Sequence, residues 1–384
     1  MSDKKVDPAL TLKQMSASIA NIAHSAAVQG PKHLFGAISG VIQQAADWLM
    51  DAKRAQYGLA VTRIVLGLMA LSMLMANFST RYYTFGNASR WTGDLANPVS
   101  DFPTIFPFSI AHSLLQSNFG LNVLYFSLMV LAVTLILGWR LRITLPVFFV
   151  LWVGFIESQD MVGDQSDNIV RMTLLGMLFA DSGLRWSLDA RRRSNVSVNG
   201  SIIVRLNNGA PIFPSWLTNL AHNLVLVVLT CQVCFVYVSG ALYKSAGDPW
   251  KQGYAIYDTL NVLQFSTWPE LASVLSIWAP SVAALSIGTI VVQVAFPGAL
   301  LHRWTRIPAM LAIFGFHLGI ALFMGLPWFS LSMIAIDFIF IRDVTWRRII
   351  SWVKRSAHSR VPIPEDALEA TELEQVEKPE TIRV

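Results

Sequence analysis

The chain has 384 residues, of which 54% are hydrophobic and 14% are charged. Soluble globular domains carry about 25% charged residues, so this composition excludes a soluble multidomain protein and indicates an integral membrane protein. Two cysteines exclude a disulfide scaffold and a cysteine-rich metal site. The net charge of +5 indicates basic cytoplasmic loops rather than a nucleic-acid partner, and we expect no nucleic acid.

Residues 1–56 show helical periodicity but no run long enough to cross a membrane, and no secretory signal peptide is expected. Apolar side chains recur every three or four residues from Leu12 to Ala26 and again from Leu34 to about Arg54, with Gly30-Pro31 between. We predict two amphipathic helices. They lie either on the inner membrane surface or in a soluble hairpin that packs on the loops, and the pattern leaves both open.

Apolar runs of membrane length follow. Crossing a bilayer takes about 20 apolar residues, and shorter runs suffice when flanking residues reach the interface. We therefore predict an all-α, polytopic membrane protein with about eight transmembrane helices in residues 57–342. The predicted spans are Tyr57–Phe78, Gly120–Leu137, Leu141–Ile156, Ile169–Leu184, Leu217–Leu242, Ala279–Leu301, Ile307–Leu326 and Trp328–Ile341. The last two are joined by a tight turn at Gly325-Leu326-Pro327.

The distribution of basic residues predicts the orientation. With the N-terminus inside, 23 of the 29 lysines and arginines fall in inner segments, four in outer loops and two within spans. This asymmetry predicts a multi-pass protein of the cell membrane with both termini in the cytoplasm. Residues 343–361 are basic and contain two tryptophans, which predicts an anchor on the inner leaflet. The acidic residues 362–384 predict a disordered tail.

No soluble-enzyme motif is present, and the seven histidines form no HExxH or i, i+4 pair, so we expect no metal site. The remaining candidates are polar residues in or beside the spans. A charge at the bilayer centre costs about 2.5–3.5 kcal/mol, so each one requires a reason.

Lys244 is the first candidate, because it follows an apolar helix that emerges on the outer side. An ammonium there is partly desolvated, which favours the neutral form that a lysine base requires. The alternative is structural: Lys244 reaches to the lipid headgroups or pairs with an acidic loop residue. The acids on that side are Glu157, Asp160, Asp164, Asp167 and Asp248.

Asp167, Asn168 and Arg171 begin the fourth span on the same side. We expect Arg171 to pair with a nearby acid and to order the loop.

His317 and Asp337 lie at the same depth in the antiparallel seventh and eighth spans, about 13 Å below the surface at 1.5 Å per residue. They act either as a hydrogen-bonded lock between helices or in proton handling. Cys231 and Cys234 form a CxxC within a helix; redox pairs favour helix N-termini, so we interpret these as core residues.

Several segments, taken in order, resemble one family. These segments are Tyr57–Gly67, Gly163–Arg171 with Ser187-Leu188-Asp189, Tyr237–Lys244 with Trp250, Gly253 and Tyr254, and Phe316-His317-Leu318. Together they resemble the HTTM domain, the membrane domain of vitamin K-dependent gamma-carboxylases and many bacterial proteins. The segment with Asp164, Asp167 and Asn168 is most similar to the sporulation-delaying protein B branch. The resemblance covers roughly Tyr57 to Arg342.

The resemblance implies roles for particular residues. The lysine that matches Lys244 is the carboxylases' base, which deprotonates vitamin K hydroquinone, and Trp250 matches the tryptophan that follows it. Asn168 falls near the carboxylases' polar residues at the start of the corresponding span. Their Asn-His pair is Asp167-Asn168 here, and we expect no counterpart of their lumenal peptide-binding region. Both departures argue against peptide glutamate carboxylation.

Two functional hypotheses follow. In the first, an outer pocket among the third, fourth, fifth and seventh spans binds a quinone-like or lipid-soluble substrate, with Lys244 as base. His317 and Asp337 then steer protons below it, and Tyr237 borders the pocket. In the second, the protein is a non-enzymatic partner in the maturation or export of a secreted peptide, or an assembly subunit. Membrane lipids are partners in both.

Overall fold

The structure is a computed structural model. It describes residues 31–86, 89, 98–159, 162–193, 205, 212–263, 265 and 267–358, without the side chains of 31–37 and 357–358. These residues are helical or irregular, with no strand among them. The chain divides into two compact units, residues 1–340 and 341–384. The first predicted amphipathic helix and the acidic tail lie outside the described residues.

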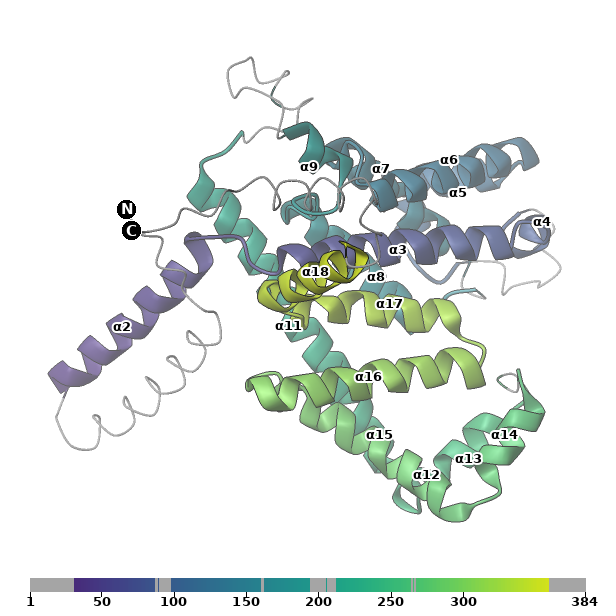
Figure 1. The fold of residues 1–384 in the computed structure, drawn as a ribbon. Coiled ribbons are helices and arrows are strands. Elements are labelled where there is room, and N and C mark those ends of the chain that lie inside the picture. The colour runs from purple at the N-terminus through teal and green to yellow at the C-terminus, as the bar shows by residue number, and fades with distance from the viewer. Residues whose placement is uncertain are drawn as a thin grey trace, which may run out of the picture. The chain divides into compact units, whose positions relative to one another are not determined.

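Within the described part of the chain, five helices are long and apolar enough to cross a membrane (Figure 1). They are α3 (Gln56–Ala76), α6 (Asn118–Leu137), α11 (Ser215–Ala246), α15 (Ala279–Ala299) and α16 (Arg303–Phe323). Two shorter apolar helices are α7 (Leu141–Ile156) and α17 (Pro327–Asp337), the latter continued by the 3-10 turn η3 (Phe338–Phe340). The protein therefore has the apolar helices of a membrane protein.

The fourth predicted span corresponds to α8 (Gln165–Phe179). With 15 residues, α8 is not one of the five helices that are long and apolar enough to cross a membrane. Its predicted end at Leu184 is wrong. The amide of Asp181 donates to His222 Nδ1 at 3.1 Å, and the carbonyl of Ser182 accepts from Arg63 at 3.3 Å. These tertiary bonds replace the helical ones beyond Phe179.

Helix α2 (Pro31–Met50) precedes these elements, and short helices connect them. The short helices are α4 (Arg81–Thr84), η2 (Phe102–Thr104), α5 (Ser109–Leu115), α9 (Leu188–Arg193), α12 (Asp248–Lys251), α13 (Ala255–Asn261) and α14 (Pro269–Ser276). The unit of residues 341–384 contains α18 (Asp343–His358). Helix α2 begins at Pro31, where the predicted break ends, because proline suits the first turn of a helix.

Local sequence signals fix several helix ends. Ser117 accepts a hydrogen bond from the Gly120 amide at the start of α6, and Gly138 ends the same helix with a left-handed φ of 64°. The predicted turn between α16 and α17 is confirmed, with Gly325 at φ 65°. A side chain is disfavoured at both glycines because their φ angles are positive.

The core lies where α3 packs against α6 and α17 and where α11 packs against α15 and α8. Gly58 permits one of the closest approaches: a Cβ atom there would lie 2.6 Å from the carbonyl oxygen of Phe338. Large buried side chains fill the rest of the core, among them Tyr125, Phe148, Phe155, Tyr237 and Phe296.

Candidate functional site

Lys244 lies near the C-terminal end of α11 and is half-buried. Its Nζ donates to Gln293 Oε1 of α15 at 3.1 Å and lies 5.6 Å from the centre of the Trp250 ring. Among the described residues, no carboxylate lies within ion-pairing distance of Lys244. Asp248, one of the acids considered as an alternative partner, faces Lys251 at 3.6 Å. Lys244 therefore pairs with none of the described acids and bonds the neutral amide of α15 instead.

Tyr237 joins the two mid-depth residues. Its hydroxyl donates to Asp337 Oδ2 at 2.6 Å and lies 3.0 Å from His317 Nε2. All three side chains are at most 1% exposed. Because the hydroxyl has one proton and gives it to Asp337, His317 must carry its proton on Nε2 and donate it to Tyr237. The chain therefore runs from His317 through Tyr237 to Asp337.

Two atoms at the ends of this chain have no partner among the described residues: His317 Nδ1 and Asp337 Oδ1. A buried polar atom without a partner costs free energy. If these side chains served only to hold helices together, we would expect both atoms to be hydrogen-bonded. The arrangement leaves an acceptor at each end of a short hydrogen-bonded chain. It can pass a proton as well as hold three helices together.

Lys244 and Tyr237 lie on one face of α11, seven residues and about 10 Å apart along the axis. Two residues of α15 contact them: Gln293 accepts a hydrogen bond from Lys244, and Phe296 packs edge-on against Tyr237 with ring centres 5.0 Å apart. The ammonium of Lys244 is close enough to His317 to interact with it electrostatically. We call Lys244, Gln293, Tyr237, His317 and Asp337 the polar column.

A second group lies where α7 ends and α8 begins. Arg171 forms an ion pair with Glu157, as expected from the sequence, and donates to Asn168 Oδ1 at 3.0 Å. Its guanidinium lies 4.8 Å from the ring centre of Phe102. Asp167 completes a capping box by accepting from the amide of Asp164 at 2.7 Å.

These side chains line a cavity of about 420 Å³. It is lined by Ile156, Glu157, Gly163, Asp164, Gln165, Asp167, Asn168 and Arg171. Burial raises the pKa of Asp167 to about 7; the bond from the Asp164 amide opposes this shift, and the nearby Asp164 and Glu157 carboxylates add to it. The carboxyl group therefore titrates near neutral pH.

The lining of this cavity does not include both groups. We expected one pocket with walls from the third, fourth, fifth and seventh spans. The cavity is lined by residues of α7, α8 and the loop between them, and α11 and α16 contribute none of its lining. Asn168, Asp167 and Arg171 thus lie together, while Lys244, Tyr237, His317 and Asp337 lie in the polar column.

The sequence assigned no role to Arg63, which is fully buried in α3. Its guanidinium donates to the carbonyls of Leu135, Ile136 at 2.9 Å and Trp186 at 2.8 Å. Leu135 and Ile136 lie in the last turn of α6, so the arginine adds donors where helical ones run out and complements the negative end of that helix. The sequence signal that could have revealed this role is a lone arginine two turns into an apolar helix.

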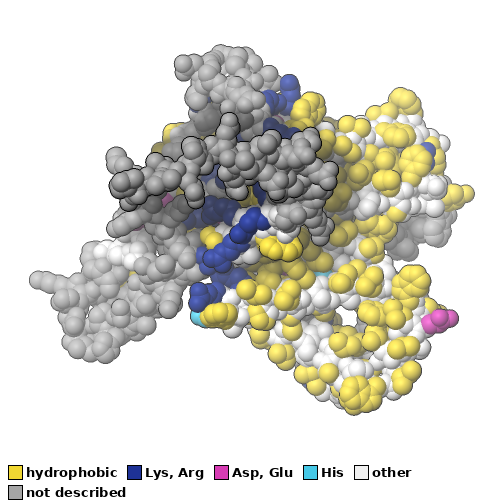
Figure 2. All heavy atoms as spheres, viewed as in Figure 1, with side chains coloured by type: hydrophobic (Ala, Val, Ile, Leu, Met, Phe, Trp, Pro, Cys, Tyr) yellow, Lys and Arg dark blue, Asp and Glu magenta, His cyan; other side chains and the backbone are white. Residues whose placement is uncertain are grey.

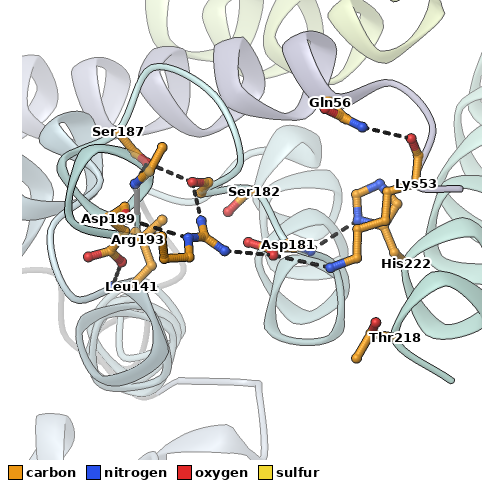
Figure 3. Close-up of polar contacts among 12 residues, drawn as sticks. Lys53, Gln56, Leu141, Asp181, Ser182, Ser187, Asp189, Arg193, Thr218 and His222 are labelled. Atoms are coloured by element: carbon orange, nitrogen blue, oxygen red, sulfur yellow. Dashed lines mark hydrogen bonds and ion pairs between the residues drawn. The ribbon is translucent and has the colours of Figure 1, made fainter. Parts of the chain in front are cut away.

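A further polar network, around Asp181, was also missed (Figure 3). Asp181 accepts from Lys53 at 3.1 Å and from Arg193 at 3.0 Å. His222 of α11 accepts from the Asp181 amide and bonds the carbonyl of Arg54 at 2.8 Å. The network ties the segment before α3, the end of α8 and the start of α11 together.

Asp189, part of the Ser187-Leu188-Asp189 segment, acts similarly at the start of α7. Its carboxylate accepts from the amides of Arg140 and Leu141, both at 2.9 Å. It therefore caps α7 from a distant part of the chain.

Cys231 is exposed and Cys234 half-buried, and neither is bonded in a disulfide. Within the described residues, no group of three or more His, Cys, Asp or Glu side chains is placed to hold a metal. The chain was compared with models of protein families, with curated proteins and with solved structures, and no match was found in any of the three comparisons.

Proposed function

We propose that this protein crosses the cell membrane eight times, with both termini in the cytoplasm, and that its membrane domain is HTTM-like. The five long apolar helices, α7, α17 and α8 supply the eight candidates. The charge asymmetry of the loops supports the orientation. Because α8 carries charge and has 15 residues, it crosses only with its flanks at the interface.

Cysteine labelling from outside tests this topology. Ser100→Cys and Ser266→Cys are expected to react with a membrane-impermeant maleimide, and Ser194→Cys and Ser359→Cys are not. External labelling at position 194 would contradict eight spans.

We further propose that the protein is an enzyme in which Lys244 is the base and the substrate is a lipid-soluble, quinone-like molecule with an acidic hydroxyl. One observation carries this proposal: Lys244 is half-buried and bonded to the neutral Gln293 rather than to a carboxylate. Burial without a counter-charge favours the neutral amine, which can accept a proton. A paired lysine would remain charged.

The rest of the polar column supports a route for the proton. His317 Nδ1 has no partner among the described residues, and the other ring nitrogen is bonded through Tyr237 to Asp337. The HTTM resemblance points to vitamin K hydroquinone as the probe for this chemistry.

Purified protein with reduced vitamin K tests the proposal. In air-saturated buffer, the parent is expected to bind the hydroquinone and to accelerate its oxidation to the quinone by dissolved oxygen, which is measured as the loss of hydroquinone fluorescence. Lys244→Ala loses that acceleration, whereas Lys251→Ala, at an exposed lysine one helix further on, keeps it. Equal rates in parent and Lys244→Ala would remove the base role and leave the non-enzymatic partnership with a secreted peptide as the better reading.

A further inference from the structure

The segment between α11 and α15, residues 248–278, carries the short helices α12, α13 and α14, and we call it the outer lip. It follows Lys244 directly and lies at the end of α11 and α15 (Figure 1). Each of the three helices in the lip is too short to cross a membrane. Its surface is nevertheless unlike that of a loop in water.

Large apolar side chains of the lip stand out from the protein. Leu263 is 95% exposed, Ile277 80% and Trp278 66%. Further exposed apolar side chains are Val262, Trp268, Leu271 and Val274. Contiguous apolar patches of this kind are rare on surfaces that face water and mark contact with a partner or a membrane.

Charge is nearly absent from the same stretch. Between Thr259 and Leu301 the only charged residue is Glu270. The acidic and basic residues of the lip gather near its start, at Asp248, Lys251 and Asp258. Protein interfaces surround their apolar centre with a polar rim. Among the described residues of the lip beyond Thr259, the exposed polar side chains are uncharged (Asn261, Thr267 and Ser273) apart from Glu270, and this scarcity of charge favours lipid over a protein partner.

The apolar surface of the lip also continues onto a helix that is apolar enough to span the bilayer. Helix α13 is tied to α15 by the Ile256 amide, which donates to Ser286 Oγ at 3.1 Å. Helix α15 exposes Ile287, Val291 and Val294 beside this contact. Apolar side chains cover much of this region in Figure 2. Trp268 and Trp278 flank α14, as tryptophans do at membrane interfaces.

We infer that the outer lip is inserted into the leaflet that holds the outer end of α11, with α14 in the interface and Leu263 and Ile277 among the acyl chains. Lys244 then borders lipid rather than open water. The inference does not depend on Lys244 being a base, and depth in the bilayer can be measured whichever side the lip lies on.

Spin labels at single cysteines test this. The background is the Cys231→Ala, Cys234→Ala protein in vesicles of phosphatidylcholine and phosphatidylglycerol. Labels replace Leu263, Val274 or Ile277, with Val291 of α15 as the lipid control and the exposed Asp101 as the water control. Collision with oxygen is expected to exceed collision with a water-soluble nickel chelate several-fold at the three lip positions and at Val291. Asp101 shows the reverse.

Two results would overturn the inference. Nickel access above oxygen access at all lip positions places the lip in water. Low access to both reagents shows that protein, such as a second copy of the chain, covers it. Val274 and Ile277 lie one turn apart, so either position serves if the other label disturbs folding, as checked by gel filtration.

Discussion

Two half-buried lysines associated with opposite ends of α11 show how differently the protein treats its two sides. Lys53, beside the start of the helix, donates to Asp181 at 3.1 Å, and Lys244, near its other end, donates to Gln293 at the same distance. One partner is a carboxylate and the other a neutral amide. A charged partner stabilises the ammonium form, and a neutral one does so only weakly. Lys53 is thus held by a counter-charge, while Lys244 is held by no carboxylate among the described residues.

The carboxyl groups repeat this contrast. Burial alone would raise the pKa of Asp181, but Arg193 and Lys53 outweigh it and hold the pKa below its usual value. Burial raises the pKa of Asp167 to about 7 on the outer side, where Arg171 is already paired with Glu157. The inner groups compensate one another and serve stability. The outer groups are incompletely compensated, which is typical of functional sites.

Exchanging each lysine for arginine gives the largest expected difference. Lys244→Arg keeps a charge that cannot be lost near neutral pH, so we expect it to fold like the parent and to lose about 100-fold or more in hydroquinone oxidation. Lys53→Arg can still bond Asp181 and is expected to keep the parent rate. The rates are measured on detergent-purified protein. Full activity in Lys244→Arg would show that the outer lysine is structural.

Removing the inner carboxylate is expected to destabilise the protein. Asp181→Ala leaves Lys53 and Arg193 without their shared partner, which costs about 2 kcal/mol after allowance for partial exposure. The Asp248→Ala change, in an exposed pair with Lys251, is expected to cost less than about 0.5 kcal/mol. Thermal unfolding in detergent measures both. Equal unfolding temperatures for the two variants would contradict the proposed difference between the two sides.

The outer carboxyl predicts a pH dependence of the opposite sign from the inner one. With its pKa raised to about 7, folded Asp167 binds its proton more tightly than the unfolded chain, so its contribution to stability falls as the pH rises from about 4 to 7. Because the pKa of Asp181 is lowered, its carboxylate stabilises the folded state above about pH 4. This contribution to stability is lost as the pH falls through the folded-state pKa. Asp167→Asn is expected to flatten the first dependence and keep the second, as followed by unfolding temperature against pH.

The smallest effect is expected at the CxxC pair. Cys231→Ala with Cys234→Ala removes one exposed and one half-buried thiol, so stability falls by less than about 1 kcal/mol and activity is unchanged. Circular dichroism melts and the hydroquinone assay test this. Lost activity in a folded double variant would instead indicate a redox role for these thiols.

The sequence by itself determined the class of protein and the positions of its apolar helices. Leu141–Ile156 was predicted to the residue, and the turn at Gly325 and the start at Pro31 followed from glycine and proline. Such features depend on neighbours along the chain, where hydropathy and backbone preference act directly. The end of α8 was missed because Asp181 and Ser182 bond to partners in distant segments.

The candidate site shows the same division. Sequence spacing placed His317 and Asp337 at one depth, yet only the packing of α11 against α15, α16 and α17 brings Tyr237 between them. The sequence identified Lys244 as a candidate but did not predict its partner Gln293. It also predicted that Asn168 and Lys244 share one pocket, whereas the cavity beside Asn168 has no lining residue from the polar column. Rotation of a helix about its axis decides which side chains meet. In an apolar helix nearly every direction is equally hydrophobic, so the sequence alone leaves that rotation undetermined.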